Sequence, residues 1–202
     1  DMPNDGDDNP VRPGRPNHRC RSKRKQLPKH KTCCGQRSLL LDLFDMQNPS
    51  MKQIIGSCRR EVKEKFLRKI KEEFSKTGFN CEKKEELKRK VANCIHECAM
   101  KKRDMVNSEG SIDFAQIRDE VDRRLPQEEW IRALVLRAVD TCEQYKYDTA
   151  WRNDPNGIIC NPQSMELTEC LWREIELNCP EEHQSSKRQC KIMRQMIAET
   201  NN

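Results

Sequence analysis

The sequence predicts an all-α fold: a compact bundle of six to eight helices stapled by disulfides. Apolar residues recur at three- and four-residue steps from Ser38 onward, and no convincing two-residue alternation typical of strands appears. Leu, Ile, Val and Phe make up only 37 of 202 residues, and the mean hydropathy is −1.03. Such a chain builds a sizeable core poorly on its own. Twelve cysteines, an even number, indicate that cross-links supply what the core cannot, as in secreted proteins.

Charge and proline divide the chain into two parts. Residues 1–10 carry four acids and no base, and residues 11–37 carry ten bases and no acid, so these 37 residues sum to +6. The remaining 165 residues hold equal numbers of acids and bases. Half of the ten prolines also lie in the first part. We therefore expect residues 1–32 to be a basic, proline-rich, flexible arm and residues 33–202 to be the disulfide-rich helical domain. A bridge at Cys20 would leave only residues 1–19 free.

The first two predicted helices follow each other closely. Residues 37–44 suggest a short buried helix that ends before Asn48 and Pro49. Ser50 is the expected N-cap of a long helix that stops at Thr77 and Gly78. At 1.5 Å per residue this helix would run roughly 40 Å, so a bend near residue 56 is expected. Its apolar stripe consists of Met51, Ile54, Ile55, Cys58, Val62, Phe66, Ile70 and Phe74.

The remaining helices are predicted from stripes and stop signals. One stripe runs from Leu87 to Cys98, and Ser111 is the expected cap of the next helix, around residues 114–125. Pro126 opens a helix that carries an apolar stripe from Trp130 to Cys142, with Glu128 and Glu129 in its first turn. Residues 153–157 are a turn signal. Ser164 is the expected cap of a helix that ends at Cys179, and a last helix runs from about residue 186 to residue 197.

The motifs favour a binding protein over an enzyme. No apolar run approaches the roughly 20 residues that span a bilayer. No signal peptide is visible, so a secreted protein would be present in its processed form. We find no catalytic constellation, and we expect no cofactor and no metal, because the four histidines lack the paired spacing of zinc ligands. His96, between two cysteines, is either a pH switch or, more simply, a surface histidine.

The cysteine spacing carries a resemblance. Cys94 and Cys98 are one helical turn apart and would each tie their helix to a different neighbour. A gap of 43 residues then leads to Cys142, a C-x8-C pair joins Cys170 to Cys179, and proline follows Cys179 directly. This arrangement, with the vicinal Cys33-Cys34, resembles the Plus-C odorant-binding proteins of insects over residues 33–190.

The resemblance implies a function in olfaction. It implies a helical fold around an apolar cavity, secretion into the fluid around sensory neurons, and carriage of small hydrophobic molecules. It also admits an odorant receptor and a homodimer as partners, whereas nucleic acid is not expected. The apolar faces of the central helices would line the cavity; the alternative for each residue is plain core packing. The candidate ligand-binding residues are Phe114, Ile117, Val121, Trp130, Leu134, Leu171 and Ile175, with Met100 and Met105 as adaptable neighbours. Trp151 and Trp172 are candidates for a pocket mouth.

The resemblance also implies a disulfide pairing. The family's core pattern would join Cys94 to Cys170 and Cys142 to Cys179. It would join Cys98 to Cys58, with Cys81 as the alternative. The other three bridges would form among the remaining cysteines in an order that stays open: Cys20, Cys33, Cys34, Cys160, Cys190 and whichever of Cys58 and Cys81 is left.

A second function comes from the charge. A secreted interaction protein without a usable pocket would bind a receptor or a polyanion through its basic arm, and the concentration of net charge in residues 1–37 favours it. Pocket binding should be nearly independent of salt, whereas polyanion binding should weaken steeply as salt rises.

Overall fold

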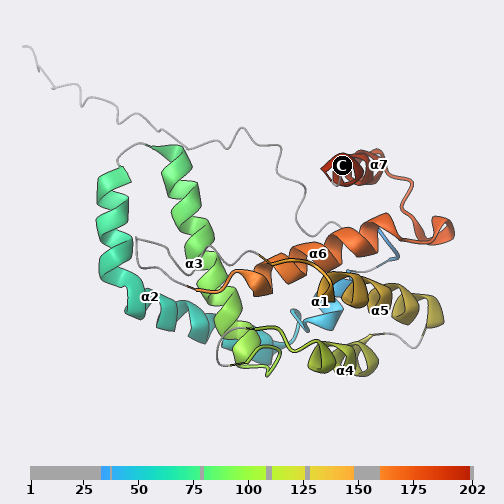
Figure 1. The fold of residues 1–202 in the computed structure, drawn as a ribbon, viewed down its shortest axis with the longest axis horizontal. Coiled ribbons are helices and arrows are strands. Elements are labelled where there is room, and N and C mark those ends of the chain that lie inside the picture. Colours follow the sequence, from blue (N-terminus) through green and yellow to red (C-terminus); the bar gives the residue numbers. More distant parts are fainter. Residues whose placement is uncertain are drawn as a thin grey trace, which may run out of the picture.

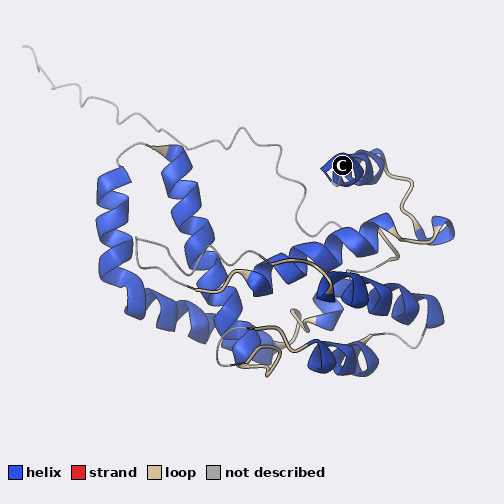
Figure 2. Cartoon of the chain, in the orientation of Figure 1, coloured by secondary structure: helices blue, strands red, loops and turns tan. Residues whose placement is uncertain are grey.

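The computed structural model describes residues 33–36, 38–77, 80–107, 111–125, 128–147 and 160–200, and within these ranges the fold is all-α. No strand occurs there, and only two isolated antiparallel bridges are formed (Figure 2). The predicted fold class is therefore confirmed, while the predicted arm at residues 1–32 lies outside the described residues. The helices are α1 (Leu39–Leu43), α2 (Pro49–Thr77), α3 (Cys81–Lys101), α4 (Phe114–Arg124), α5 (Glu129–Glu143), α6 (Gln163–Leu177), the 3-10 helix η2 (Glu181–His183) and α7 (Arg188–Thr200).

The helices form a body and a hairpin. Helix α6 is central, because it contacts α1, α3, α5 and α7, and α4 packs against α1 and α5. Helices α2 and α3 pair with each other and project to one side of the body, and α2 bends partway along its length in this view (Figure 1). We call α2 and α3 together the helical hairpin. None of the helices in the described part of the chain is long and apolar enough to cross a membrane.

The long helix α2 begins two residues earlier than expected, at Pro49 instead of Met51. Ser50 is not its N-cap, since Ser50 already lies inside the helix and donates its backbone N–H to Asn48 Oδ1 at 2.9 Å. Asn48 is thus the acceptor at this end, and Pro49 takes the first helical position, where its missing N–H costs nothing. The predicted stop is confirmed, because α2 ends at Thr77.

Two other serine caps were predicted wrongly for a similar reason. Helix α4 is capped by Asp113, whose carboxylate accepts a backbone N–H in the first turn, whereas Ser111 lies before the helix. Ser164 is fully buried inside α6, and the Asn161 side chain accepts a backbone hydrogen bond at the start of that helix. Asp113 occupies the N-cap of α4, whereas the N-cap of α6 is Pro162, which has no capping side chain, so the upstream Asn161 accepts the first backbone N–H of that helix.

The body has one main core. Buried side chains of α1, α4, α5 and α6, together with residues that end and follow α3, form a single apolar cluster, which we call the main core. Smaller clusters lie elsewhere. The hairpin seam joins α2 to α3 through Val62, Phe66, Leu87 and Cys94. A third cluster places Met193 and Ile197 of α7 beside the Cys33–Cys190 bridge.

Five disulfides join described residues. Cys58–Cys98 and Cys94–Cys160 hold the hairpin, so each cysteine of the C-x3-C helix does tie α3 to a different neighbour, as expected. The expected Cys58–Cys98 bridge is present. The other bridges are Cys142–Cys170, Cys34–Cys179 and Cys33–Cys190, and Cys81 is disulfide-bonded as well. Cys20 lies outside the described residues.

Two implied bridges are wrong. Cys94 pairs with Cys160 and not with Cys170, and Cys142 pairs with Cys170 and not with Cys179. The packing of α5 on α6 explains the change, because it brings the Cα atoms of Cys142 and Cys170 to 5.9 Å, within bridging distance. Cys179, beyond the end of α6, is then bonded to Cys34.

Candidate functional site

The nine predicted ligand-binding residues meet in one place. Seven of them are buried in the main core: Met100, Met105, Ile117, Val121, Leu134, Leu171 and Ile175. Phe114 and Trp130 are partly buried and pack against it. The residues come from α3, α4, α5, α6 and the segment after α3, so the sequence correctly identified side chains that converge from distant parts of the chain.

These side chains are core residues in the described structure. Ile117, Val121 and Leu171 have no exposed surface, and Met105 has none either. The main core also contains residues that the sequence did not single out as ligand contacts. Helix α1 contributes Leu39, Leu40 and Leu43, and α5 contributes Val135 and Val139. Their helical periodicity was the available signal, but it does not distinguish a pocket lining from a packed interior.

Trp130 lies at one edge of the main core, where η2 and the segment 33–36 pack against it. Its ring stacks on His183 of η2, with ring centroids 3.7 Å apart and planes 10° from parallel. The indole N–H donates to Glu128 at 2.8 Å. Gly35 approaches so closely that an added Cβ would lie 3.3 Å from the indole, and its N–H donates to the His183 carbonyl at 2.9 Å. Residues 33–36 and η2 therefore close this edge.

Trp172 does not lie at a pocket mouth. It is partly buried and touches both the main core and the cluster around Cys33 and α7, so it connects the two. Its buried indole N–H has no hydrogen-bond partner within the described part of the chain. Trp151, the other candidate for a mouth, lies outside the described residues.

Glu176 is a buried carboxyl one turn further along α6. One carboxyl oxygen accepts the backbone N–H of Cys33 at 3.2 Å, and the other has no partner among the described residues. Burial raises the pKa of Glu176, against the smaller opposing effects of the Cys33 and Cys34 N–H groups and the positive charge of Arg194. Glu176 and Trp172 thus place two unsatisfied polar atoms near apolar clusters, a feature that the sequence did not reveal.

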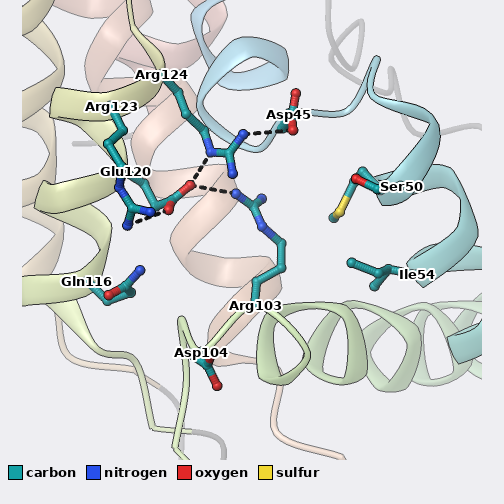
Figure 3. Close-up of a pocket in the computed structure, with 10 residues that line it drawn as sticks. Asp45, Ser50, Ile54, Arg103, Asp104, Gln116, Glu120, Arg123 and Arg124 are labelled. Carbon is teal, nitrogen blue, oxygen red and sulfur yellow. Dashed lines mark hydrogen bonds and ion pairs between the residues drawn. The ribbon is translucent and has the colours of Figure 1, made fainter.

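A cavity of about 260 Å³ lies away from the nine predicted residues, between the start of α2, the end of α3 and α4 (Figure 3). Its centre is Glu120, which is 4% exposed. Three guanidinium groups bind this carboxylate: Arg103 and Arg123 each at 2.8 Å, and Arg124 as well. The full lining is Asp45, Ser50, Met51, Ile54, Arg103, Asp104, Gln116, Glu120, Arg123 and Arg124.

The charges around this cavity already satisfy one another. Arg124 reaches Asp45 at 2.7 Å, and Arg103 donates to the Phe44 carbonyl at 2.8 Å. Hydrogen bonding to Glu120 raises the pKa of Arg124, whereas burial lowers that of Arg103. The lining holds three arginines and three carboxylates, so it presents no net charge to a ligand. The network joins α4 to the ends of α1 and α3.

The two described histidines lie apart and do not form a site. His96 lies half-buried on α3, His183 stacks on Trp130, and His18 and His30 fall outside the described residues. Within the described ranges no group of three or more His, Cys, Asp or Glu side chains has an arrangement that could hold a metal ion.

In its described residues the chain is thus a disulfide-stapled helical body with a main apolar core, a charged cavity and a projecting helical hairpin. Comparison with protein-family models, with curated proteins and with solved structures gives no match.

Proposed function

We propose that the chain is a secreted, non-enzymatic carrier of small hydrophobic ligands, of the Plus-C odorant-binding type. The observation that supports this most is the convergence of all nine predicted ligand-binding residues on the main core. At least five disulfides stabilise the helices around that core, each by about 2–4 kcal/mol where it constrains the unfolded chain. The same bridges favour an oxidising compartment outside the cell.

A ligand can enter the main core only if some of its side chains move. In the described structure the nine side chains pack against one another or against the same cluster, so a ligand must displace some of them. Met100 and Met105 are suited to this, because an unbranched thioether chain adapts to irregular space more easily than Leu or Ile. The unpartnered atoms of Trp172 and Glu176 would supply the polar contacts that orient a ligand.

The family assignment rests on cysteine spacing and the helical fold, since two of the three core bridges differ from those that the resemblance implied. Carriage can therefore be tested without reference to the family. The test is a titration of the full-length oxidised protein with N-phenyl-1-naphthylamine, which fluoresces in apolar surroundings, followed by competition with small volatile alcohols and esters.

We expect saturable binding at about one site per chain, unchanged by salt. Leu134→Ala shortens a core side chain and should raise the Kd by roughly fivefold, because several apolar carbons lose contact with the probe. Leu67→Ala is the matched control, since Leu67 is 37% exposed on α2, outside the main core. If protein shown to have no free thiols gives no saturable fluorescence signal, ligand carriage is refuted and surface interaction is left as the function.

A further inference from the structure

The helical hairpin carries a large share of the positive charge. Helices α2 and α3 contain fifteen Lys and Arg and eight Asp and Glu, a net charge of +7. The rest of residues 38–202 contains fourteen bases and 21 acids, a net charge of −7. Residues 38–202 have no net charge as a whole, but their positive charge is concentrated on the hairpin and their negative charge on the rest. The hairpin projects from the body, so the two charges are also separated in space (Figure 1).

The positive side chains of the hairpin face outward. The seam between the helices is filled by apolar residues, so the charged positions remain for solvent. All nine basic residues of α2 are exposed, as are three of the six on α3; Lys84, Lys90 and Lys101 are half-buried. A charged surface of this kind attracts a polyanion over a distance of about 8–10 Å at physiological salt.

Part of this charge is not neutralised locally. Pairs such as Lys88–Glu85 at 2.7 Å and Lys90–Glu86 at 3.1 Å satisfy some lysines within α3. Arg60, Lys63 and Lys71, in contrast, form no ion pair with any described residue. Helical periodicity places these three on one side of α2, over a rise of roughly 17 Å. We call Arg60, Lys63 and Lys71 the basic strip.

The hairpin lacks the features of a membrane-binding helix. Such a helix presents a broad apolar face beside its lysines and arginines. On the hairpin, Leu67 is the one large apolar side chain, among those described, that is clearly exposed. The other apolar residues hold α2 against α3, and inserting them into lipid would open the seam. The occupant that fits is a linear, water-soluble polyanion, bound along the ridge by its charged groups.

We propose that the helical hairpin is a docking surface for a sulfated polysaccharide, with the basic strip as its centre. The disulfides favour an oxidising, extracellular compartment, and sulfated polysaccharides are abundant polyanions there. The net charge of −7 on the remainder repels the same polymer and directs it to the hairpin. This binding is separate from ligand carriage, because it uses exposed charges and leaves the main core closed.

The test measures heparin binding by the full oxidised chain over a range of salt concentrations. The triple variant Arg60→Glu, Lys63→Glu, Lys71→Glu should weaken binding about tenfold or more and reduce its salt dependence, because each reversed charge replaces an attraction with a repulsion. The matched control reverses Arg137, Lys146 and Arg188 to Glu, three exposed cations outside the hairpin that form no ion pair with described residues. It should weaken binding less than threefold.

Two further measurements distinguish heparin binding at the hairpin from binding at the N-terminal arm and from membrane binding. Replacing Arg19, Arg21, Lys23, Arg24 and Lys25 with Gln in the full chain tests the N-terminal arm. Loss of heparin binding in that variant, with full binding in the hairpin variant, would overturn the proposal. Tighter binding to phosphatidylserine vesicles than to heparin would overturn it in favour of a membrane. Unchanged circular dichroism and an unchanged Kd for N-phenyl-1-naphthylamine would show that the triple variant is folded and that carriage is unaffected.

Discussion

The main core and the helical hairpin stabilise helices in different ways. The main core gathers apolar side chains from five helices and from the segment after α3, so each buried residue has neighbours on several sides. The hairpin seam lies between two single helices, and its described buried residues form two small clusters, Val62, Phe66, Leu87 and Cys94 in one and Met51, Cys58 and Ala99 in the other. The bridges Cys58–Cys98 and Cys94–Cys160 hold this thinner unit, and Cys81 of α3 is disulfide-bonded as well.

The difference separates a packed apolar interior, the proposed ligand site, from a charged exterior. A region with many apolar neighbours is close-packed, so a ligand must displace side chains to enter it. A thin hairpin buries few side chains, and its outward faces are free for charge instead. The following changes test this contrast, from the largest expected effect to the smallest.

Removing the bridge at the base of the hairpin should have the largest effect. Replacing Cys58 and Cys98 with Ser frees a loop of 40 residues and should lower the free energy of unfolding by about 4 kcal/mol. Hydrogen exchange should show α2 and α3 losing protection first, while α5 and α6 keep theirs. The same replacement at Cys142 and Cys170 should instead lower protection across the body; equal loss in both regions would contradict the contrast.

The same truncation should cost more in the main core than in the seam. Leu171→Ala, at a site with no exposed surface, should lower the free energy of unfolding by about 3 kcal/mol, since the crowded surroundings cannot collapse into the cavity. Leu87→Ala in the seam should cost about 2 kcal/mol, because solvent and flexible lysines can fill the space. Urea denaturation of both variants measures the difference, and a larger cost at Leu87 would reverse the interpretation.

The buried ion-pair network should matter less than the apolar packing. Glu120→Gln keeps the shape of the side chain but removes the charge that Arg103, Arg123 and Arg124 share. We expect a loss of about 2 kcal/mol, the usual size for hydrogen bonds to a charged group. Thermal unfolding at low and high salt measures it. Asp122→Gln is the control, because Asp122 pairs with Arg132 at an exposed position.

Glu176 should give the smallest effect, visible as a pH dependence. Burial raises the pKa of this carboxyl in the folded state, so the folded protein holds the proton more tightly than the unfolded chain does. The stability contributed by the protonated form is therefore lost as pH rises from the ordinary value of 4.5 through the folded pKa. Glu176→Gln, which cannot ionise, should remove this decline; an unchanged pH profile of unfolding would contradict it.

The sequence predicted what depends on local pattern. Helical periodicity placed the helices and identified the nine residues that converge on the main core, and the C-x3-C spacing indicated two different neighbours for α3. It could not predict the other bridges, because cysteine spacing does not determine connectivity. The Glu120 network was missed because Arg103 and Asp45 lie outside α4, and only the fold brings them to Glu120 and Arg124.

The charge separation between hairpin and body could be predicted from the sequence only in part. The residues can be counted in the sequence, but the domain appears neutral until the structure shows that α2 and α3 pair with each other and project together. The serine caps were missed on a smaller scale for a similar reason. Asn48, Asp113 and Asn161 accept first-turn N–H groups as well as serine would, and only the position of the first helical turn decides which side chain is in place to do so.

The central claim is that the main core binds an apolar ligand and the charged surface does not. The most direct measurement is the Kd of N-phenyl-1-naphthylamine for the full-length oxidised protein, at low salt and again at roughly 1 M salt, where exposed charges are screened beyond about 3 Å. The account predicts saturable binding at about one site per chain with the same Kd in both conditions. Binding that is absent, or that weakens steeply with salt, would contradict it.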